Sequence, residues 1–246
     1  MSLSLPWLEP DSVWFPDPAT ALTEPNGLLA VGGDLSARRL LAAYRRGIFP
    51  WFEQGQPPLW WSPDPRMVLF PGEFHLSRSL RKTLRSARFR VSSDRDFAGV
   101  TAACAAPRRS VSGTWLIPAM RSAYQKLHQL GYAHSVEVWQ DEQLAGGLYG
   151  VALGRVFFGE SMFSHARDAS KIALATLAAQ LHRHGYRVID CQVSNPHLHS
   201  LGARAITRHD FLRYLGPSDD AIPPPPSWPV EWHGTLSLSA NDGSAS

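Results

Sequence analysis

The sequence predicts a protein of mixed helices and strands whose larger, C-terminal part is organised around a sheet. Strand-like and helix-like segments alternate over residues 63–216, and the stretch 148–193 reads as strand, helix and strand. Residues 1–35 are rich in proline and glycine, and an irregular segment dense in aromatic residues and prolines follows a short helix, so we place a domain boundary near Ser62. A proline-rich extension at 217–246, with "AIPPPP" and "NDGSAS", is predicted to hold little regular structure.

The N-terminal part is expected to form loops and turns around one short helix. Asp34 or Ser36 can cap a helix through "ARRLLAAYRRG", because short oxygen-bearing side chains accept the first free N–H groups, and Gly47 ends it. The aromatic and proline-rich segment that follows, "IFPWFEQGQPPLWWSPDPRMVLF", is expected to be irregular and to lead into a strand at 67–70.

The larger part is predicted to contain helices and strands that are recognised from their periodicity and their end signals. Ser77 is placed to cap the first of these helices, and Pro118 stands in the first turn of the second. Asp168 or Ser170 opens the third, which Gly185 ends. The predicted helices lie in "HLSRSLRKTLRSARFRV", "PAMRSAYQKLHQLG", "KIALATLAAQLHRHG" and "RHDFLRYL", and the predicted strands lie in "HSVEVW", "LAGGLYGVALGRVFFGESMF" and "YRVIDCQV".

The composition is typical of a globular protein, with 44% hydrophobic and 18% charged residues. Only two cysteines occur, which favours a reducing compartment over a disulfide framework. The first residues lack the basic and apolar regions of a signal peptide, and no apolar run reaches membrane-spanning length. We therefore expect a cytoplasmic protein with no membrane partner.

The formal net charge is only +3, so the placement of the charges matters more than their sum. On the helix that Ser77 begins, one face carries the four residues that we call the basic stripe, which are Arg78, Arg81, Lys82 and Arg85. A charge run usually forms a solvated face, but such a face normally mixes both signs, since like charges at this spacing repel. We therefore favour contact of the basic stripe with a polyanion.

Two acids stand at the ends of strands that are predicted to be neighbours. Glu160 ends the strand in "FFGESMF", and Asp190 ends the strand in "VIDCQV". Neighbouring strands lie about 4.8 Å apart, and ligands bind at the carboxyl ends of parallel strands, so both acids could face one pocket. The alternative is that each acid caps or pairs locally.

Other groups in this region could line that pocket or have only a structural role. Cys191 has no base beside it in the sequence and is expected to alternate away from Asp190 and Gln192, so we interpret it as a structural cysteine. The histidines at 182, 184, 197 and 199 are not spaced to converge on a metal, and loops for phosphate, dinucleotide or coenzyme A binding are absent, so we expect neither metal nor cofactor. The apolar residues that are either core or pocket walls are Leu148, Phe157, Met162, Leu174 and Ile189.

Several long and unusual blocks of the sequence point to one family. They are "EPNGLLAVGGDLS", "AYRRGIFPWF", "LWWSPDPR", "GTWLIPAMRSAYQKLHQLGYAHSVEVW", "GGLYGV", "GESMFS", "ASKIAL", "IDCQVSN" and "SLGA". Together they resemble the bacterial leucyl/phenylalanyl-tRNA–protein transferases, and the similarity runs from Pro16 to Leu215.

The resemblance implies an α+β protein, with a small N-terminal α+β domain at 1–62 and a GNAT-like acyltransferase domain with a mixed sheet at 63–216. It implies an aminoacyltransferase that moves leucine or phenylalanine, and methionine as a further candidate, from aminoacyl-tRNA to the N-terminal α-amine of proteins starting with arginine or lysine. The product would carry a destabilising N-terminus for Clp-type degradation. The missing coenzyme A loop agrees with an acyl donor that is an ester on RNA, and we expect a monomer.

The resemblance also implies roles for particular residues. Asp190, Gln192 and Asn195 would act on the attacking amine and the ester. Glu160, together with Asp190, would recognise the arginine or lysine of the acceptor. The five apolar residues would hold the leucine or phenylalanine side chain, and the basic stripe would grip the phosphates of the tRNA. The terminal adenosine would be held by the aromatic side chains of Trp51 and Trp115, with Tyr44 and Tyr124 assisting.

Two other functions remain open at this point. A GNAT-like aminoacyl-tRNA user that builds peptidoglycan bridges would share the fold and the donor, but it would need a site for a lipid-linked muropeptide. A non-catalytic RNA-binding protein would use the basic stripe and the aromatic residues without the acids. Replacement of Asp190 separates an enzyme from a binding protein. An enzyme would lose transfer and keep tRNA binding, whereas a binding protein would lose nothing.

Overall fold

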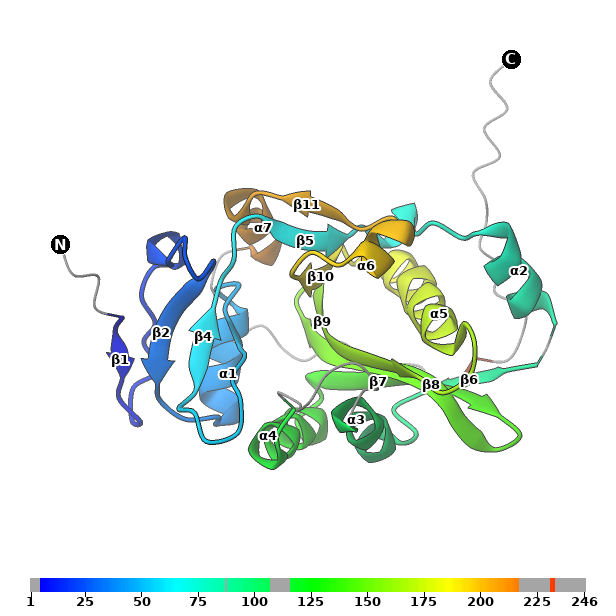
Figure 1. Cartoon of the computed structure of the whole chain (residues 1–246), viewed down its shortest axis with the longest axis horizontal. Helices are drawn as coiled ribbons and strands as arrows, with labels where there is room; N and C mark the ends of the chain where they lie inside the picture. Colours follow the sequence, from blue (N-terminus) through cyan, green and yellow to red (C-terminus); the bar gives the residue numbers. More distant parts are fainter. Residues whose placement is uncertain (1–4, 87, 107–115, 217–230, 233–246) are drawn as a thin grey trace, which may run out of the picture.

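A computed structural model describes residues 5–86, 88–106, 116–216 and 231–232, which form two sheets with helices packed around them (Figure 1). The smaller sheet is N-terminal and lies on the left of Figure 1, and the larger one occupies the centre. The chain passes from one sheet to the other between Trp61 and Arg66.

The N-terminal part holds a small sheet with strand order β1-β2-β4-β3. The residue pattern predicted only loops, turns and one helix here, and that prediction is wrong, because strands this short show no readable alternation. The helix itself is confirmed: Ser36 caps it by accepting a hydrogen bond from the backbone N–H of Arg39. The elements are β1 (Trp7–Leu8), a 3-10 turn (Pro18–Thr20), β2 (Leu28–Gly32), α1 (Ala37–Tyr44), β3 (Phe49–Pro50) and β4 (Leu59–Trp61).

The large sheet has the strand order β11-β5-β10-β9-β8-β7-β6-β12. Its neighbouring strands run antiparallel except β9 and β10, which run parallel with Asp190 opposite Phe158. The predicted parallel pairing is thus confirmed, and the sheet is mixed. Its strands are β5 (Arg66–Leu69), β6 (Arg90–Ser93), β7 (Ala133–Gln140), β8 (Gln143–Leu153), β9 (Val156–Ser164), β10 (Val188–Gln192), β11 (Arg204–Ile206) and β12 (Glu231–Trp232). Apart from β12, the proline-rich tail lies outside the described residues.

Helices cover both faces of the large sheet (Figure 1). The face drawn upward in Figure 1 carries α5 (Ala169–Arg183), and the lower face carries α3 (Phe97–Ala105) and α4 (Pro118–Gln129). Strand alternation divides the core accordingly, since Phe157 and Ile189 pack on the α5 side and Phe158 packs on the other. The remaining elements are a 3-10 turn (Pro71–Glu73), α2 (Arg78–Arg85), α6 (Pro196–Ser200) and α7 (Arg208–Leu215).

The helices begin where they were predicted to begin, but the residue at the start of α5 does not cap it in the predicted way. Ser77 caps α2 by accepting a hydrogen bond from the backbone N–H of Leu80, as predicted. Asp168 occupies the cap position of α5, but its φ is 67° and its side chain makes no capping bond. The Asp168 carboxylate instead pairs with Lys171, at 3.1 Å.

Candidate active site

A pocket of about 530 Å³ lies where β9 and β10 end, between α5, α6 and the segment after β3. The structure brings all five apolar residues that the sequence singled out onto its walls, together with both the acid Glu160 and the amide Gln192. The five are Leu148, Phe157, Met162, Leu174 and Ile189. Four of them are almost fully buried and Met162 is half-buried. The walls are therefore apolar, with polar groups at one end.

Two β-bulges shape this end of the sheet. Glu160 is the extra residue of β9 against β8, and Cys191 is the extra residue of β10 against β5. The pairing between β9 and β10 stops just before the bulges, at Phe158 and Asp190. A bulge redirects the side chains that follow it and ends regular pairing. Glu160 and Gln192 therefore lie on strand ends that are no longer bonded to each other through the backbone.

Glu160 is buried, with 8% of its surface exposed, and three side chains donate hydrogen bonds to it. Tyr44 and Gln192 donate to Oε1, at 2.8 and 3.2 Å, and Tyr124 donates to Oε2, at 2.6 Å. Burial raises the pKa of Glu160 to about 7, although the two tyrosine hydrogen bonds act in the opposite direction. Glu160 is therefore a pocket carboxyl that changes its charge near neutral pH.

Asp190 lies on the opposite face of β10 from the pocket, and the structure corrects its expected contact with substrate. Its side chain is fully buried, and both carboxylate oxygens are bound by Arg66, from Nε to Oδ1 at 2.8 Å and from Nη2 to Oδ2 at 2.6 Å. Because neighbouring residues on a strand face opposite ways, Ile189 in the pocket wall places Asp190 behind that wall. Asp190 is therefore not among the residues that line the pocket.

No role was predicted for Arg66 from the sequence. Two signals were available. The buried strand β5 begins at Arg66, and a buried cation requires an acid partner. Asp190, at the end of another buried strand, was the matching charge.

Gln192 reaches the pocket because the bulge reverses its direction. Its φ is 65°, a left-handed value that costs a non-glycine residue about 1 kcal/mol. Its backbone N–H donates to Asp190 Oδ1 at 2.9 Å, which helps to hold this conformation. Cys191 and Asp190 lie on different sides of the strand, as expected. Cys191 and Gln192, which were expected on opposite sides, both line the pocket. Burial raises the pKa of the Cys191 thiol, which disfavours the thiolate that a nucleophile requires.

Asn195 lies at the pocket edge and caps α6. Its Oδ1 accepts a hydrogen bond from the backbone N–H of His197 at 2.8 Å, and Pro196 fills the first helical position. His197 also lines the pocket, although the sequence indicated no role for it. Asn195 thus has its oxygen committed to the helix, while its Nδ2 group is available as a donor.

The aromatic residues that were expected to hold an adenosine divide into two groups. Trp51 is 46% exposed at the pocket rim, and its ring lies 5.6 Å from that of Trp61. Trp115 lies outside the described residues. Tyr44 and Tyr124 are fully buried, their hydroxyl oxygens lie 2.9 Å apart, and each hydroxyl donates to Glu160. The expectation that these tyrosines contact a base is corrected, because neither ring has an open face; instead, they hold Glu160.

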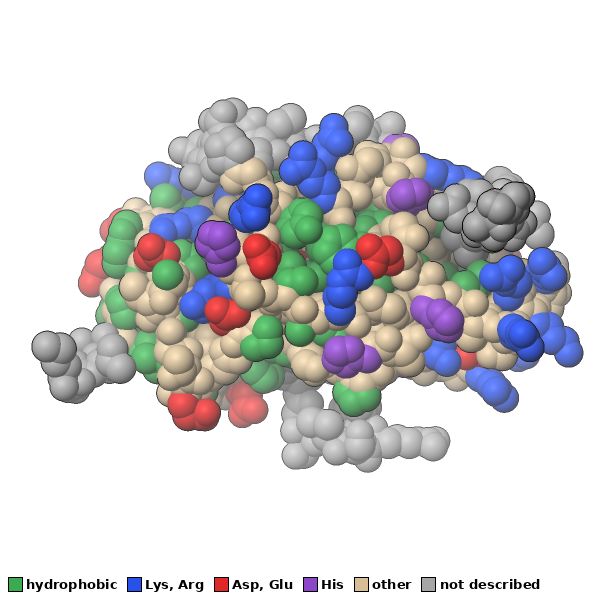
Figure 2. All heavy atoms as spheres, turned by 90° about the horizontal axis from the view of Figure 1, so that it is seen from above, with side chains coloured by type: hydrophobic (Ala, Val, Ile, Leu, Met, Phe, Trp, Pro, Cys, Tyr) green, Lys and Arg blue, Asp and Glu red, His purple; other side chains and the backbone are tan. Residues whose placement is uncertain are grey.

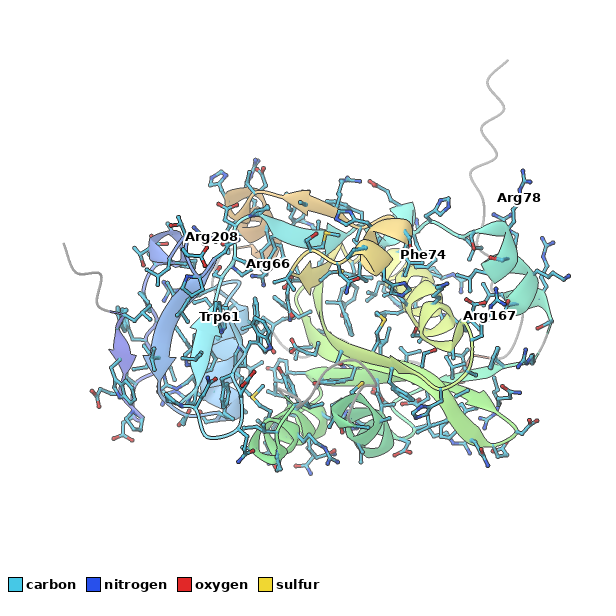
Figure 3. All side chains as sticks on the ribbon, viewed as in Figure 1. Trp61, Arg66, Phe74, Arg78, Arg167 and Arg208 are labelled. Carbon is cyan, nitrogen blue, oxygen red and sulfur yellow. The ribbon has the colours of Figure 1, made fainter. Side chains whose placement is uncertain are left out.

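The basic stripe lies on α2, at the opposite end of the large sheet from the N-terminal part. Arg78, Arg81, Lys82 and Arg85 are all exposed, and none of them forms an ion pair with a described residue. Figure 2 shows a gathering of Lys and Arg side chains at this end, on its right. Figure 3 shows Arg78 projecting outward from α2, whereas Arg66 points into the molecule. The stripe is therefore an exposed cationic surface whose charges no described acid neutralises.

The described part of the chain holds neither a metal-binding cluster nor a membrane-spanning helix. No group of three or more metal-ligating side chains gathers there to hold an ion. No described helix is long and apolar enough to cross a membrane.

Solved structures show only weak similarity to the chain. A GCN5-related N-acetyltransferase from Kribbella flavida is 10% identical, with a TM-score of 0.38 over 68% of this chain and 59% of the other. L-PGS from Bacillus licheniformis is 12% identical, with a TM-score of 0.37 over 68% and 53% of the two chains. Such TM-scores are too low to support an argument about the fold.

Sequence relatives are much closer. Proteins named leucyl/phenylalanyl-tRNA–protein transferase are 63% identical in Ectopseudomonas mendocina, over 86% of this chain and 93% of the relative, and 64% identical in Azotobacter vinelandii, over 85% and 92%. The protein of that name in Pseudomonas aeruginosa is 60% identical, over 86% and 93%. The family model of leucyl/phenylalanyl-tRNA protein transferase matches residues 68–216, and the model of its N-terminal domain matches residues 33–64. The chain therefore belongs to the leucyl/phenylalanyl-tRNA protein transferase family of aminoacyltransferases.

Proposed function

We propose that the protein transfers leucine or phenylalanine, with methionine as a third donor, from aminoacyl-tRNA to the N-terminal α-amine of proteins that begin with arginine or lysine. The transfer forms a peptide bond, and the new N-terminus marks the protein for Clp-type degradation. The observation that supports this most directly is a buried carboxyl, Glu160, at the polar end of an apolar pocket and 3.2 Å from the amide of Gln192.

The apolar walls suit the side chain of the transferred amino acid. A volume of about 530 Å³ is within the usual range for small-molecule sites, and Leu148, Phe157, Met162, Leu174 and Ile189 offer no charge to a ligand. A charged side chain would be excluded by the cost of its desolvation. Leucine and phenylalanine would be separated only weakly, since one methylene group is worth about 1–3 kcal/mol in such a pocket.

Glu160 suits the side chain of the acceptor residue. An ionised carboxylate pairs with a guanidinium or an ammonium group through charge-assisted hydrogen bonds. Three hydrogen bonds already hold Glu160 in place, so it would lose little freedom on binding. A bound arginine or lysine would also favour the ionised form of Glu160 and lower its pKa.

The chemistry asks little of the protein beyond positioning. An aminoacyl ester is already activated, and a free α-amine with a pKa near 8 is partly neutral at pH 7. The protein must align the amine with the ester and stabilise the oxyanion that forms. The Nε2 group of Gln192 and the Nδ2 group of Asn195 are the donors that we propose for this oxyanion. Asp190 contributes through the backbone of Gln192, to which it is bonded at 2.9 Å.

The tRNA would contact two surfaces. Trp51, together with Trp115, would stack on the terminal adenosine, because aromatic faces stack on unpaired bases. The exposed cations of the basic stripe would bind phosphates further along the tRNA, without reading its sequence. We further propose that the protein acts as a monomer in the cytoplasm, and light scattering of the purified protein tests the monomer.

A transfer assay tests the proposal. The protein is mixed with radiolabelled leucyl-tRNA and with peptides that begin with arginine, lysine or alanine. We expect label on the arginine and lysine peptides and none above background on the alanine peptide. Equal labelling of all three peptides would contradict the acceptor assignment, and transfer to none of them would contradict the whole proposal.

A further inference from the structure

Arg66 is a fully buried cation behind the pocket, and the function proposed above does not use it directly. Figure 3 shows it inside the molecule, where the N-terminal part meets the large sheet. Its guanidinium lies between the rings of Phe49 and Phe211, at 4.8 and 4.7 Å from their centroids. Phe49 belongs to β3 and Phe211 to α7, so three separate segments of the chain enclose this one charge.

Stability alone does not account for the pair of Arg66 with Asp190. The desolvation of two buried charges offsets most of their attraction, and an apolar pair of similar volume is often as stable or more so. Arg66 Nη1, moreover, has no hydrogen-bond partner within the described part of the chain. A pair that stability does not require is a candidate for a role in placing other groups.

The group that this pair places is Gln192. Asp190 Oδ1 accepts two hydrogen bonds, one from Arg66 Nε at 2.8 Å and one from the backbone N–H of Gln192 at 2.9 Å. The second bond holds Gln192 in its left-handed conformation, at φ 65°. That conformation turns the side chain of Gln192 into the pocket, where its Nε2 lies 3.2 Å from Glu160 Oε1.

We propose that Arg66 is a positioning residue for aminoacyl transfer. Arg66 binds both oxygens of Asp190 and so holds the carboxylate in place. This carboxylate holds the backbone of Gln192, and the position of the Gln192 amide next to Glu160 follows from it. The inference rests on the proposed function, in which Gln192 and Glu160 meet the acceptor amine and the ester. Arg66 itself touches no substrate, because it lies behind the pocket wall with no exposed surface.

Two double variants test this proposal as a matched pair. Arg66→Met/Asp190→Leu replaces the ion pair by apolar side chains of similar size and removes the acceptor for the N–H of Gln192. Arg66→Gln/Asp190→Asn also removes both charges, but it keeps an oxygen for that N–H and a donor at the position of Arg66 Nε. The first, or apolar, variant therefore lacks the side-chain oxygen that accepts the hydrogen bond from the Gln192 N–H, and the second, or amide, variant keeps it.

We expect the apolar variant to lose about 100-fold in kcat, the scale of a misplacement of about 1 Å, with an unchanged Kd for leucyl-tRNA. The amide variant is expected to keep kcat within about tenfold of the unmodified protein, because the acceptor for Gln192 is preserved. Equal kcat in both variants would overturn the proposal. Arg66→Lys, which keeps the charge and removes the two-point contact, provides a further case if a double variant does not fold. Its kcat should fall without a change in the Kd for tRNA, and an unchanged kcat would also overturn the proposal.

A second measurement does not depend on transfer. Hydrogen exchange of the Gln192 backbone amide, followed by NMR, should be slow in the unmodified protein and in the amide variant, and at least tenfold faster in the apolar variant. If exchange is equally slow in all three, Asp190 does not hold Gln192 and the proposal is wrong. If exchange behaves as expected but peptides starting with alanine are labelled as well as those starting with arginine, the proposed acceptor fails and the positioning role stands.

Discussion

Among the described side chains of the large sheet, two glutamates are buried, and they differ in what surrounds them. Glu137, on β7, is fully buried and enclosed by donors from the protein: the hydroxyls of Ser92 and Ser135 and the backbone N–H groups of Arg95 and Asp96. Glu160, on β9, also accepts hydrogen bonds, but it opens onto the pocket. The enclosed Glu137 can only bind groups of the protein itself, whereas Glu160 can also bind a ligand in the pocket.

The largest effect should come from removing the charge that faces the pocket. We expect Glu160→Gln to lower kcat/KM for peptides starting with arginine or lysine by about 100-fold or more, because loss of one partner of a buried charge pair costs about 2–5 kcal/mol. The matched control is Glu137→Gln, which makes the same chemical change in the enclosed acid. The comparison between the two acids fails if Glu137→Gln alters acceptor preference as much as Glu160→Gln does.

The same two variants should change stability in opposite directions. Burial raises the folded-state pKa of Glu160 to about 7, above the ordinary 4.5, so the folded protein binds more protons than the unfolded chain between these values. Stability therefore falls as pH rises from 4.5 to 7, and ionised Glu160 costs up to about 3 kcal/mol above that range. At pH 8, Glu160→Gln should stabilise the protein by about 1–3 kcal/mol.

Glu137→Gln should instead destabilise the protein by about 1–3 kcal/mol at pH 8, because it leaves buried donors without their acceptor. Urea unfolding at pH 5 and pH 8 measures both variants. The gain from Glu160→Gln should disappear at pH 5, where Glu160 is already protonated in the folded state. A gain of equal size at both pH values would show that ionisation of Glu160 is not its cause.

Much of the pocket was predictable from the sequence, and the reason is periodicity. Phe157 and Ile189 both point to the α5 side because they occupy matching positions on β9 and β10, which pair in parallel as predicted. The same periodicity should have excluded Asp190 from the pocket, since it is the neighbour of Ile189 and faces the other way. The expectation that both residues meet the substrate was inconsistent with a regular strand.

The bulges account for what periodicity could not predict. A bulge adds one residue to a strand and shifts the direction of every side chain after it, and it has no reliable mark in the sequence. This is why Gln192 faces the pocket although Asp190 does not, whereas Cys191 lies on the same side as Ile189 by ordinary alternation. The small N-terminal strands were missed for another reason, because segments of two to five residues are too short to show alternation.

The basic stripe lies far from the pocket and, unlike the two acids, is exposed to solvent. We expect the double variant Arg81→Gln/Lys82→Gln to weaken tRNA binding about tenfold at low salt and to reduce the slope of log K against log salt by about one unit per lost contact. Transfer at saturating tRNA should be unchanged, because the pocket is intact. The matched control is Arg88→Gln, which removes another exposed cation just beyond the stripe. If the double variant leaves affinity and salt dependence unchanged, the stripe is only a solvated face.

The smallest effect concerns the pH at which Glu160 gains its charge. A cationic acceptor binds the ionised form, so its affinity should rise with pH and level off above the pKa of about 7. Tyr124→Phe removes the hydrogen bond that most lowers this pKa, and the midpoint of the affinity curve should therefore move to higher pH.

Tyr149 supplies the matched control for this prediction. It is also fully buried, but its hydroxyl has no hydrogen-bond partner in the described part of the chain, so Tyr149→Phe should leave the midpoint in place. The ligand should be an arginine peptide analogue without an α-amino group, since that group titrates near pH 8 and would hide the titration of Glu160. An equal shift in both variants would mean that the loss of a buried hydroxyl, and not the hydrogen bond to Glu160, moves the midpoint. A shift in Tyr124→Phe alone would tie the charge of the pocket to the tyrosine that the family resemblance had assigned to the adenosine.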